Sequence, residues 1–377
     1  MEARIIPPRP GWRTGRWLRS LAAVGSTDGV ESDTPVIQTA VLEPTVNPGV
    51  NPAVNPSLLA EDLPRLPEDL TRVEAELQDS VRAEDPFLSQ VASHLLGAGG
   101  KRLRPTLTLC CAYAVGGGVA GAGAVTGGCS VELVHLGSLY HDDVIDEATT
   151  RRGVPSVNAR WSNIAAILAG DFLLARASQL AASLGADVAG LLASTIGELC
   201  RGQVLELQHL FDVERSEEGY YSAIEGKTAA LFATACRIGG MVHDMPPETL
   251  DGLSAFGHHL GMCFQIVDDV LDLTSELDQL GKAGGQDLVE GVYTLPVIYE
   301  LRTDPHLKEL LGSPLDPEQL ARARSIARSN GSVAAAIKVA GRHAEQAHDA
   351  LAAAPGVDPV IADALRRLGE DLLRRTR

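Results

Sequence analysis

Apolar residues recur at intervals of three and four along most of this chain from Ser57 onward. That spacing gathers them on one face of an α-helix, and no stretch alternates convincingly with the period of two that is typical of a half-buried strand. It predicts helices over residues 69–81, 86–96, 131–146, 162–183, 187–210, 220–240, 250–275, 294–302, 317–328, 331–353 and 358–375. The expected fold class is all-α, a helical bundle of roughly 320 residues around a central cavity into which functional side chains point.

One uncharged stretch, from Pro105 to Val131, is long enough to be considered as a membrane span. It contains seven glycines between Gly116 and Gly128, which lower its hydropathy and disfavour a continuous helix. The pattern therefore predicts a helix, a glycine-rich turn and a second helix.

The first 56 residues follow a different pattern. Five scattered prolines precede a small Val-Asn-Pro repeat at 46–48, 50–52 and 54–56. Proline continues neither a helix nor an inner strand, so we expect 1–56 to be a flexible tail and 57–377 to be one domain. Within the tail, Trp12 to Leu21 has arginines at three-residue spacing, which suits a short helix on an anionic lipid surface. A tail without such a role is the alternative.

Composition narrows the range of possible functions. With 377 residues, 45% of them hydrophobic, the chain can bury a large core. The net charge of -17 argues against nucleic acid as a partner, because phosphate backbones are bound by basic surfaces. The six cysteines form no C-x-x-C motif, so we expect free, buried thiols in a reducing cytosol and no zinc site.

Two copies of one acidic motif indicate the chemistry: Asp-Asp-Val-Ile-Asp at 142–146 and Asp-Asp-Val-Leu-Asp at 268–272. On a helix, the first and last carboxylates of each copy lie on one face, one turn apart. Either copy alone would be a common solvated face, but both follow strongly apolar segments. Carboxylates that close to a core are neutralised unless a cation satisfies them. Magnesium suits this role, since it binds one or two carboxylates together with substrate phosphates.

Candidate phosphate-binding cations lie near these motifs. Lys101 and Arg104 are three residues apart at the predicted start of a helix, and Arg151 and Arg152 closely follow the first acidic motif. His135 lies two helical turns before Asp142 on the same face. Together they predict a site for a diphosphate.

In chain order, these motifs resemble those of the trans-polyprenyl diphosphate synthases. The resemblance covers about residues 60–377. Its pieces are Gly-Gly-Lys-Arg-x-Arg-Pro at 99–105, the first acidic motif with Arg151-Arg152-Gly153, Gly170-Asp171, Gly226-Lys227-Thr228, Phe264-Gln265 before the second acidic motif, Gly281-Lys282 and Asp287. It implies the class I isoprenoid synthase bundle and a magnesium-dependent trans-prenyltransferase that joins isopentenyl diphosphate to an allylic diphosphate.

The resemblance also implies a role for each matching residue. Asp142 and Asp146 would hold two Mg²⁺ ions, and Asp268 with Asp272 a third, all bridging the allylic diphosphate. The residues expected to contact that diphosphate are Arg151, Lys227, Thr228, Gln265 and Lys282. Those expected to bind isopentenyl diphosphate are Lys101, Arg104, His135 and Arg152. Asp143 and Asp269 are expected to act through water or hydrogen bonds, and Arg102 to pair with a neighbouring acid. Asp142, Asp146, Asp268 and Lys227 are the candidate catalytic residues.

Product length should depend on Gly137 and Ser138, which precede Asp142 by five and four positions. No bulky aromatic blocks this depth, and one helical turn of about 5.4 Å is close to an isoprene unit. Gly137 serving only close helix packing is the alternative. Leu139-Tyr140-His141 and Glu290-Gly291-Val292 resemble actinobacterial long-chain synthases, which implies a product of about seven to ten units for menaquinone. Many relatives have lysine where this chain has Val292, so one cation near the second acidic motif is missing.

Several other functions remain open. A short-chain farnesyl or geranylgeranyl diphosphate synthase would share every motif. A terpene cyclase typically lacks the second acidic motif, and a non-catalytic subunit of a heteromeric synthase would be expected to have lost a motif. A metal phosphohydrolase suggested by His141-Asp142 lacks the companion histidines. The resemblance implies a homodimer, and a cytoplasmic enzyme with peripheral contact with the inner membrane face suits a lipid product.

Overall fold

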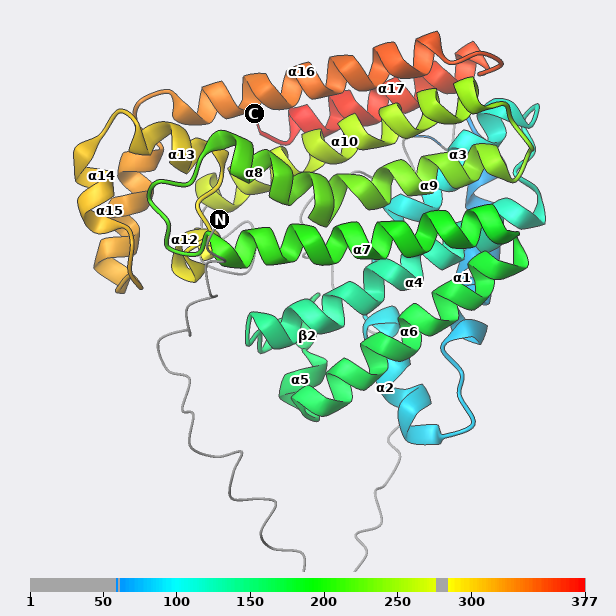
Figure 1. Ribbon diagram of the computed structural model, residues 1–377, viewed down its shortest axis with the longest axis horizontal. Coiled ribbons are helices and arrows are strands. Elements are labelled where there is room, and N and C mark those ends of the chain that lie inside the picture. The colour runs from blue at the N-terminus through cyan, green and yellow to red at the C-terminus, as the bar shows by residue number, and fades with distance from the viewer. Residues whose placement is uncertain (1–58, 60–61, 276–283, 377) are drawn as a thin grey trace, which may run out of the picture. The chain divides into compact units, whose positions relative to one another are not determined.

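The computed structural model describes residues 59, 62–275 and 284–376, and within these ranges the chain is almost entirely helical (Figure 1). The helices are α1 (Leu66–Ser80), α2 (Pro86–Gly97), α3 (Leu103–Val115), α4 (Gly121–Ile145), α5 (Val157–Arg160), α6 (Asn163–Ser183), α7 (Ala186–Gln208), α8 (Glu217–Ile224), the π-helical turn η3 (Glu225–Ala229), α9 (Ala230–Met241), α10 (Pro247–Thr274), α12 (Gln286–Glu290), α13 (Leu295–Leu301), α14 (Pro305–Leu310), α15 (Pro317–Ala327), α16 (Ser332–Ala353) and α17 (Pro359–Arg374). The predicted all-α class is confirmed.

Most predicted helices are present with small shifts of their ends. The glycine-rich stretch is a helix, a turn and a helix, as predicted, but the turn is shorter than expected: α3 ends at Val115 and α4 begins at Gly121, ten residues before the predicted start at 131. The short helices α5, α12 and α14 were not predicted, and neither was a short antiparallel hairpin of β1 (Thr150–Arg151) and β2 (Val154–Pro155). Strands of two residues are too short to show a period, so the sequence pattern could not reveal them.

Two long helices form the centre of the bundle. Helix α4 packs against α3 and α6, and α10 packs against α9 and α16. In Figure 1, α16 and α17 lie along α10, and α6 lies along α4. A helix with neighbours on several sides must be apolar around most of its circumference, and both sequences are. Each of the two helices ends in one of the acidic motifs.

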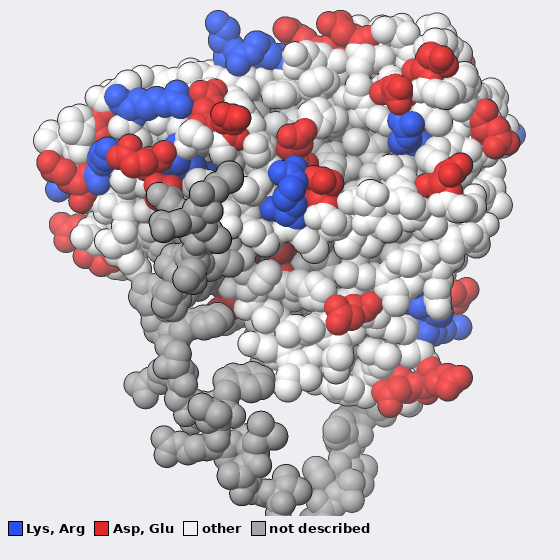
Figure 2. Space-filling view, viewed as in Figure 1, with Lys and Arg blue, Asp and Glu red and all other residues white. Residues whose placement is uncertain are grey.

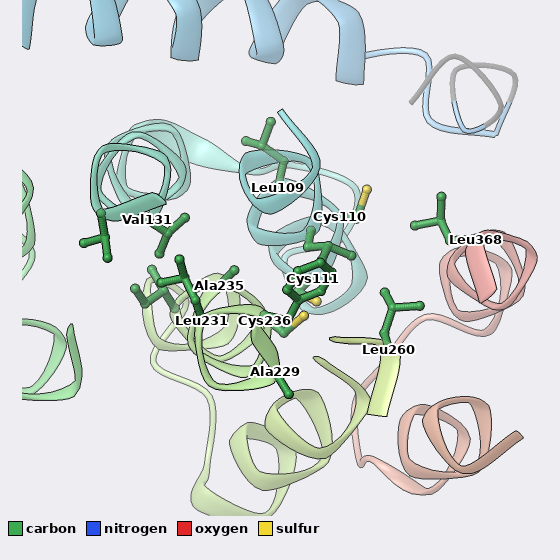
Figure 3. Packing of buried hydrophobic residues seen from close by; sticks show 14 of the residues in the cluster. Leu109, Cys110, Cys111, Val131, Ala229, Leu231, Ala235, Cys236, Leu260 and Leu368 are labelled. Atoms are coloured by element: carbon green, nitrogen blue, oxygen red, sulfur yellow. The ribbon is translucent and has the colours of Figure 1, made fainter. Parts of the chain in front are cut away.

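Small side chains allow the central helices to approach closely. Figure 3 shows part of the buried cluster, with Leu109, Cys110 and Cys111 of α3 beside Leu231, Ala235 and Cys236 of α9. Each fully buried aliphatic side chain contributes about 1.5–3 kcal/mol. All six cysteines are free, as expected, but Cys200 is exposed, which corrects the expectation that every thiol is buried.

A smaller hydrophobic cluster joins α12, α13, α14 and α15, next to the main core. Tyr293 lies in it, fully buried, and its hydroxyl accepts a hydrogen bond from the amide of Gly312 at 2.6 Å. The loop between α7 and α8 packs on the same region, because the amide of Phe211 donates to the carbonyl of Gly291 at 2.8 Å. The segment 291–294 is therefore held from both sides.

The predicted tail 1–56, its boundary with the domain at residue 57 and the proposed lipid-binding segment Trp12–Leu21 lie outside the described residues. Among the described helices, α6 alone has a length and composition sufficient to cross a bilayer, and one third of its most apolar window is buried. Core helices of soluble proteins have the same composition, so this criterion alone does not make α6 a membrane span.

Candidate active site

Both acidic motifs lie at the C-terminal ends of the two central helices. Asp142 and Asp143 are in the last turn of α4, with Asp146 as its C-cap, while the 268–272 motif occupies the last two turns of α10. None of the six aspartates is exposed, and Asp143 and Asp269 are buried. Residues near both helix ends line one pocket, including Asp146 and Asp269. The sequence motifs therefore meet in space.

Burial raises the pKa values of several carboxylates near these helix ends. It raises the pKa of Asp142 to about 6, with Lys227 opposing the shift and Asp146 adding to it. It raises the pKa of Asp269 to about 7, against the hydrogen bonds from Tyr220 and Gln265. The pKa values of Asp268, Asp272 and Asp287 are also raised, in each case chiefly by burial. A group of carboxylates with raised pKa values favours binding of a cation or protons.

The middle aspartate of each motif is held by protein partners. Arg151 donates from Nε to Asp143 Oδ1 at 2.7 Å. Asp269 accepts from the Tyr220 hydroxyl at 2.6 Å and from Gln265 Nε2 at 2.8 Å. Asp146, at the end of the first motif, lines the pocket, while Arg151 and Gln265, both expected at the diphosphate, brace the motifs here.

A hydrogen-bonded chain extends from the second motif to the turn η3. Thr228 donates from Oγ1 to Gln265 Oε1 at 2.7 Å, and Gln265 in turn donates to Asp269. Thr228 and Gln265, which are far apart in the sequence, are therefore direct neighbours. The arrangement fixes which way the amide of Gln265 points.

Lys227, in the π-helical turn, points into the pocket. Its Nζ lies 2.5 Å from Glu206 Oε1 on α7. Burial lowers the pKa of this lysine, but Glu206 and Asp142 raise it more, so its pKa is raised overall and the side chain is charged. Gly202 makes the crossing of α7 and η3 possible, because a Cβ there would lie 2.3 Å from the Lys227 amide nitrogen.

A second group of cations lies beside the first helix end. Arg104 is buried, with its Cζ 4.9 Å from the Phe232 ring centroid, and burial together with Arg152 lowers its pKa to about 10. Burial and the arginines at 104, 152, 151 and 102 keep the pKa of His135 well below its usual value, so its imidazole is neutral. Burial and, to a smaller extent, Arg375 lower the pKa of Lys101, while Asp268 opposes the shift.

Arg102 and Arg152 are tied to their surroundings. Arg102 pairs with Glu74 at 2.9 Å and with Glu132 at 3.3 Å, as the sequence led us to expect. Arg152 donates from Nη1 to the backbone carbonyls of Leu95 and Gly99. Arg102 is therefore a structural residue, whereas the charge of Arg152 stays close to His135 and Arg104.

Two predicted residues occupy the depth at which product length should be set. Gly137 faces α6, where a Cβ would lie 3.1 Å from the carbonyl oxygen of Gly170 and 3.2 Å from Leu174 Cγ. Its small size therefore serves helix packing, which was the alternative interpretation. Ser138 is half-buried and donates from Oγ to the carbonyl of His135 at 2.9 Å. Their role in chain length stays a prediction, and Lys282 lies outside the described residues.

Among the pocket residues that sequence reasoning missed are three with ionisable side chains, Glu206, Arg215 and Tyr220. Tyr220 precedes Lys227 by seven positions, so helical spacing could have found it. Glu206 and Arg215 belong to no local motif: Glu206 reaches the pocket through the crossing of α7 and η3, and Arg215 through the path of the α7–α8 loop. Asp287, noted as part of a motif, lines the pocket too.

The donor set suits a hard divalent cation. Within 62–275 and 284–376, no three carboxylate, histidine or cysteine side chains converge closely enough to hold a metal alone. The two motifs instead offer pairs of outer carboxylates, among which burial raises the pKa values of Asp142, Asp268 and Asp272. Such pairs suit Mg²⁺, which takes its remaining ligands from phosphate and water.

Comparisons with known proteins agree with this geometry. The polyprenyl synthetase family profile matches residues 85–327. A nonaprenyl diphosphate synthase of Mycobacterium tuberculosis is 40% identical over 76% of this chain and 87% of its own length. A decaprenyl diphosphate synthase structure from Rhodobacter capsulatus has a TM-score of 0.79 and 34% identity, covering 85% of this chain and 99% of that one.

A second structure also resembles this chain. It is a polyprenyl synthase from Caulobacter crescentus complexed with calcium and isoprenyl diphosphate. Its TM-score is 0.79 at 29% identity, and the match covers 87% of this chain and all of that one.

Proposed function

This chain belongs to the polyprenyl synthetase family and is a long-chain trans-prenyltransferase, and on that premise we propose that it uses Mg²⁺ and that the pocket between the ends of α4 and α10 is its active site. The observation that carries the proposal is the meeting of both acidic motifs with Lys227 around this pocket. We further propose a product of about seven to ten isoprene units for the side chain of menaquinone.

We assign metal binding to the outer carboxylates. Asp142 and Asp146 would hold two ions, and Asp268 with Asp272 a third. When bound, Mg²⁺ neutralises the negative charge that develops on the departing diphosphate. The calcium and isoprenyl diphosphate in the Caulobacter crescentus relative support a divalent ion next to a diphosphate.

The residues of the pocket would promote the first step, cleavage of the allylic carbon–oxygen bond. The bonding electron pair leaves with the diphosphate, which makes charge stabilisation the main task of the site. Lys227 supplies a fixed positive charge in a buried pocket, where electrostatic interactions are strong. Thr228 and Gln265 are oriented by their mutual hydrogen bond, and we assign them, with Lys282 and Arg151, to the same diphosphate.

Isopentenyl diphosphate would bind beside Lys101, Arg104, Arg152 and His135. The neutral imidazole of His135 can donate a hydrogen bond to phosphate without adding another charge to the arginine cluster. The double bond of this substrate then supplies the electron pair for the new carbon–carbon bond. A proton leaves the adjacent carbon, and the released diphosphate is its acceptor. No side-chain nucleophile is required.

We propose that the enzyme is a homodimer formed through α6. Ile164, Ile167 and Leu168 on this helix are 61%, 43% and 59% exposed, although they are apolar. Figure 2 shows few charged side chains over the face that α6 and α7 present in this view. An apolar face of this kind is typical of a protein interface. We also propose a cytoplasmic location with peripheral membrane contact, which suits release of a lipid product.

A prenyltransfer assay tests the proposed function. The full chain is incubated with labelled isopentenyl diphosphate, Mg²⁺ and either a farnesyl or a geranylgeranyl primer, and the products are separated by chain length. We expect elongation to about seven to ten units, loss of activity with a chelator and recovery with Mg²⁺. Asp142→Asn should abolish turnover, while Asp187→Asn, on the exposed start of α7, should not. Products of only three or four units would indicate a short-chain synthase, and an absence of elongation would exclude the proposal.

A further inference from the structure

Arg215 is a buried arginine of the pocket with unused hydrogen-bond donors. It lies in the loop between α7 and α8, is 5% exposed and lines the pocket with Lys227 and Asp269. Its Nη1 donates to the carbonyl of Tyr293 at 3.0 Å. Its Nε and Nη2 atoms are buried and have no hydrogen-bond partner among the described residues. Buried polar groups are nearly always bonded, so two orphan donors on one guanidinium require an explanation.

Neighbouring carboxylates do not satisfy this guanidinium. Glu206 is already paired with Lys227, and Asp269 already accepts hydrogen bonds from Tyr220 and Gln265. Arg215 Cζ lies 5.6 Å from the Tyr220 ring centroid, which adds only a weak attraction. Burial lowers the pKa of Arg215, and the attraction of Glu206, Tyr220 and Asp269 offsets only part of that effect. The arginine is therefore available to an anion that enters the pocket.

Arg215 also lies close to the position at which the sequence lacks an expected positive charge. Val292 lines the same pocket, and it occupies the place where the resemblance led us to expect a lysine. Arg215 is anchored to the carbonyl of Tyr293, the residue that follows Val292. The anchor is firm, because Tyr293 is fully buried and the α7–α8 loop is bonded to Gly291. A positive charge thus stands beside the position at which the chain lacks one.

We propose that Arg215 binds the diphosphate of the allylic substrate, and that it supplies from the α7–α8 loop the positive charge that is missing at Val292. Its Nε and Nη2 atoms form one edge of the guanidinium fork, which matches two oxygens of a phosphate group. Its role is distinct from that of Lys227, because Lys227 lies on η3 and shares its charge with Glu206. This inference rests on the proposed function, since it concerns the substrate of the same site.

The test measures binding of Mg²⁺-pyrophosphate to the full chain by calorimetry, without turnover. Arg215→Gln should weaken binding about 10- to 100-fold, the loss expected for hydrogen bonds to a charged group. Adding Val292→Lys to Arg215→Gln should restore most of the affinity. Arg201→Gln is the matched control, because Arg201 is exposed on α7 and pairs with Glu198, so binding should be unchanged.

Arg215→Lys is a second variant for the case in which Arg215→Gln misfolds, since lysine keeps the charge and one donor for the Tyr293 carbonyl. We expect its affinity for Mg²⁺-pyrophosphate to fall about tenfold, because the fork is lost. Wild-type affinity in Arg215→Gln would overturn the inference. A double variant as weak as Arg215→Gln would also overturn it, because the loss would then come from the loop that Arg215 anchors. If the wild-type chain itself failed to bind Mg²⁺-pyrophosphate, the proposed function would fail first.

Discussion

Arg375, near the end of the chain, lies with its Nη1 3.3 Å from Oδ1 of Asp268 in the second acidic motif. The arginine is 8% exposed, and it lowers the otherwise raised pKa of Asp268. A carboxylate that we assign to a metal ion is therefore also paired with an arginine. Metal and arginine must compete for the same oxygen.

The first prediction concerns this competition. Arg375→Gln should lower the Mg²⁺ concentration required for half-maximal binding about two- to fivefold, because an ion pair of this kind contributes up to about 1 kcal/mol. Mn²⁺ binding followed by electron paramagnetic resonance, with both proteins at the same pH, is a suitable measurement. Arg374→Gln is the control, because Arg374 pairs with Glu370 and not with the pocket. Unchanged or weaker binding in Arg375→Gln would contradict the competition.

The second prediction is a loss of stability in acid at the contact of α10 with α16. The Nδ1 atoms of His259 and His343 lie 3.1 Å apart, so one of the two rings must be neutral to accept the hydrogen bond. Burial and the neighbouring histidines lower the pKa of His343 to about 4, and burial with His258 lowers that of His259.

Because both pKa values are lower in the folded chain, the unfolded chain binds more protons between about pH 6.5 and pH 4. The folded state should therefore be most stable above about pH 6.5, and the free energy of unfolding should decrease as the pH drops toward 4. Chemical denaturation across this range measures it. His343→Gln should flatten the pH dependence, while substitution of the exposed His306 should leave it as steep as in the wild type. Equal slopes for all three proteins would rule out this pair as the cause.

The third prediction concerns product length. Ser138→Phe places an aromatic ring at the depth where the growing chain should pass, so products should be shorter by at least one isoprene unit. Ser138→Ala removes only the hydroxyl that donates to His135 and should leave product length unchanged. Chromatography of the dephosphorylated products distinguishes them. The same product distribution for both variants would mean that the tunnel does not run past Ser138.

The fourth prediction concerns the apolar face of α6. Leu168→Lys should convert a dimer to a monomer at micromolar concentration, because a buried, unpaired charge at an interface is costly. Light scattering after size-exclusion chromatography measures the mass. Val360→Lys, on the 64% exposed start of α17, should have no effect on mass. If the wild-type chain is already a monomer under these conditions, the proposed interface through α6 is wrong.

Local patterns in the sequence were sufficient for the helices and for the two acidic motifs, because helical periodicity and i, i+4 spacing are properties of short segments. The family resemblance added the expectation that Arg102 would pair with an acid. Local patterns could not place Glu206 beside Lys227 or Arg215 beside Val292, because those contacts depend on how η3 crosses α7 and on the course of the α7–α8 loop. The π-helical turn and the two-residue strands leave no periodic signal either.

Gly137 illustrates a different limit. Its small size was visible in the sequence, and two explanations, an open tunnel and close packing, were both reasonable. A Cβ at this position would lie 3.1 Å from the carbonyl of Gly170, so close packing against α6 by itself favours a small residue here. Residue size on one helix therefore cannot identify a tunnel until the neighbouring helix is known.

The crossing of α7 and η3 has a practical consequence for engineering this enzyme. A Cβ at Gly226 would lie 2.7 Å from the carbonyl of Glu198, just as one at Gly202 would collide with the Lys227 amide. Saturation libraries intended to change primer preference should keep both codons fixed. Random mutagenesis under selection should recover almost no surviving clones with changes at either position, even though neither glycine has a side chain to contribute to the chemistry.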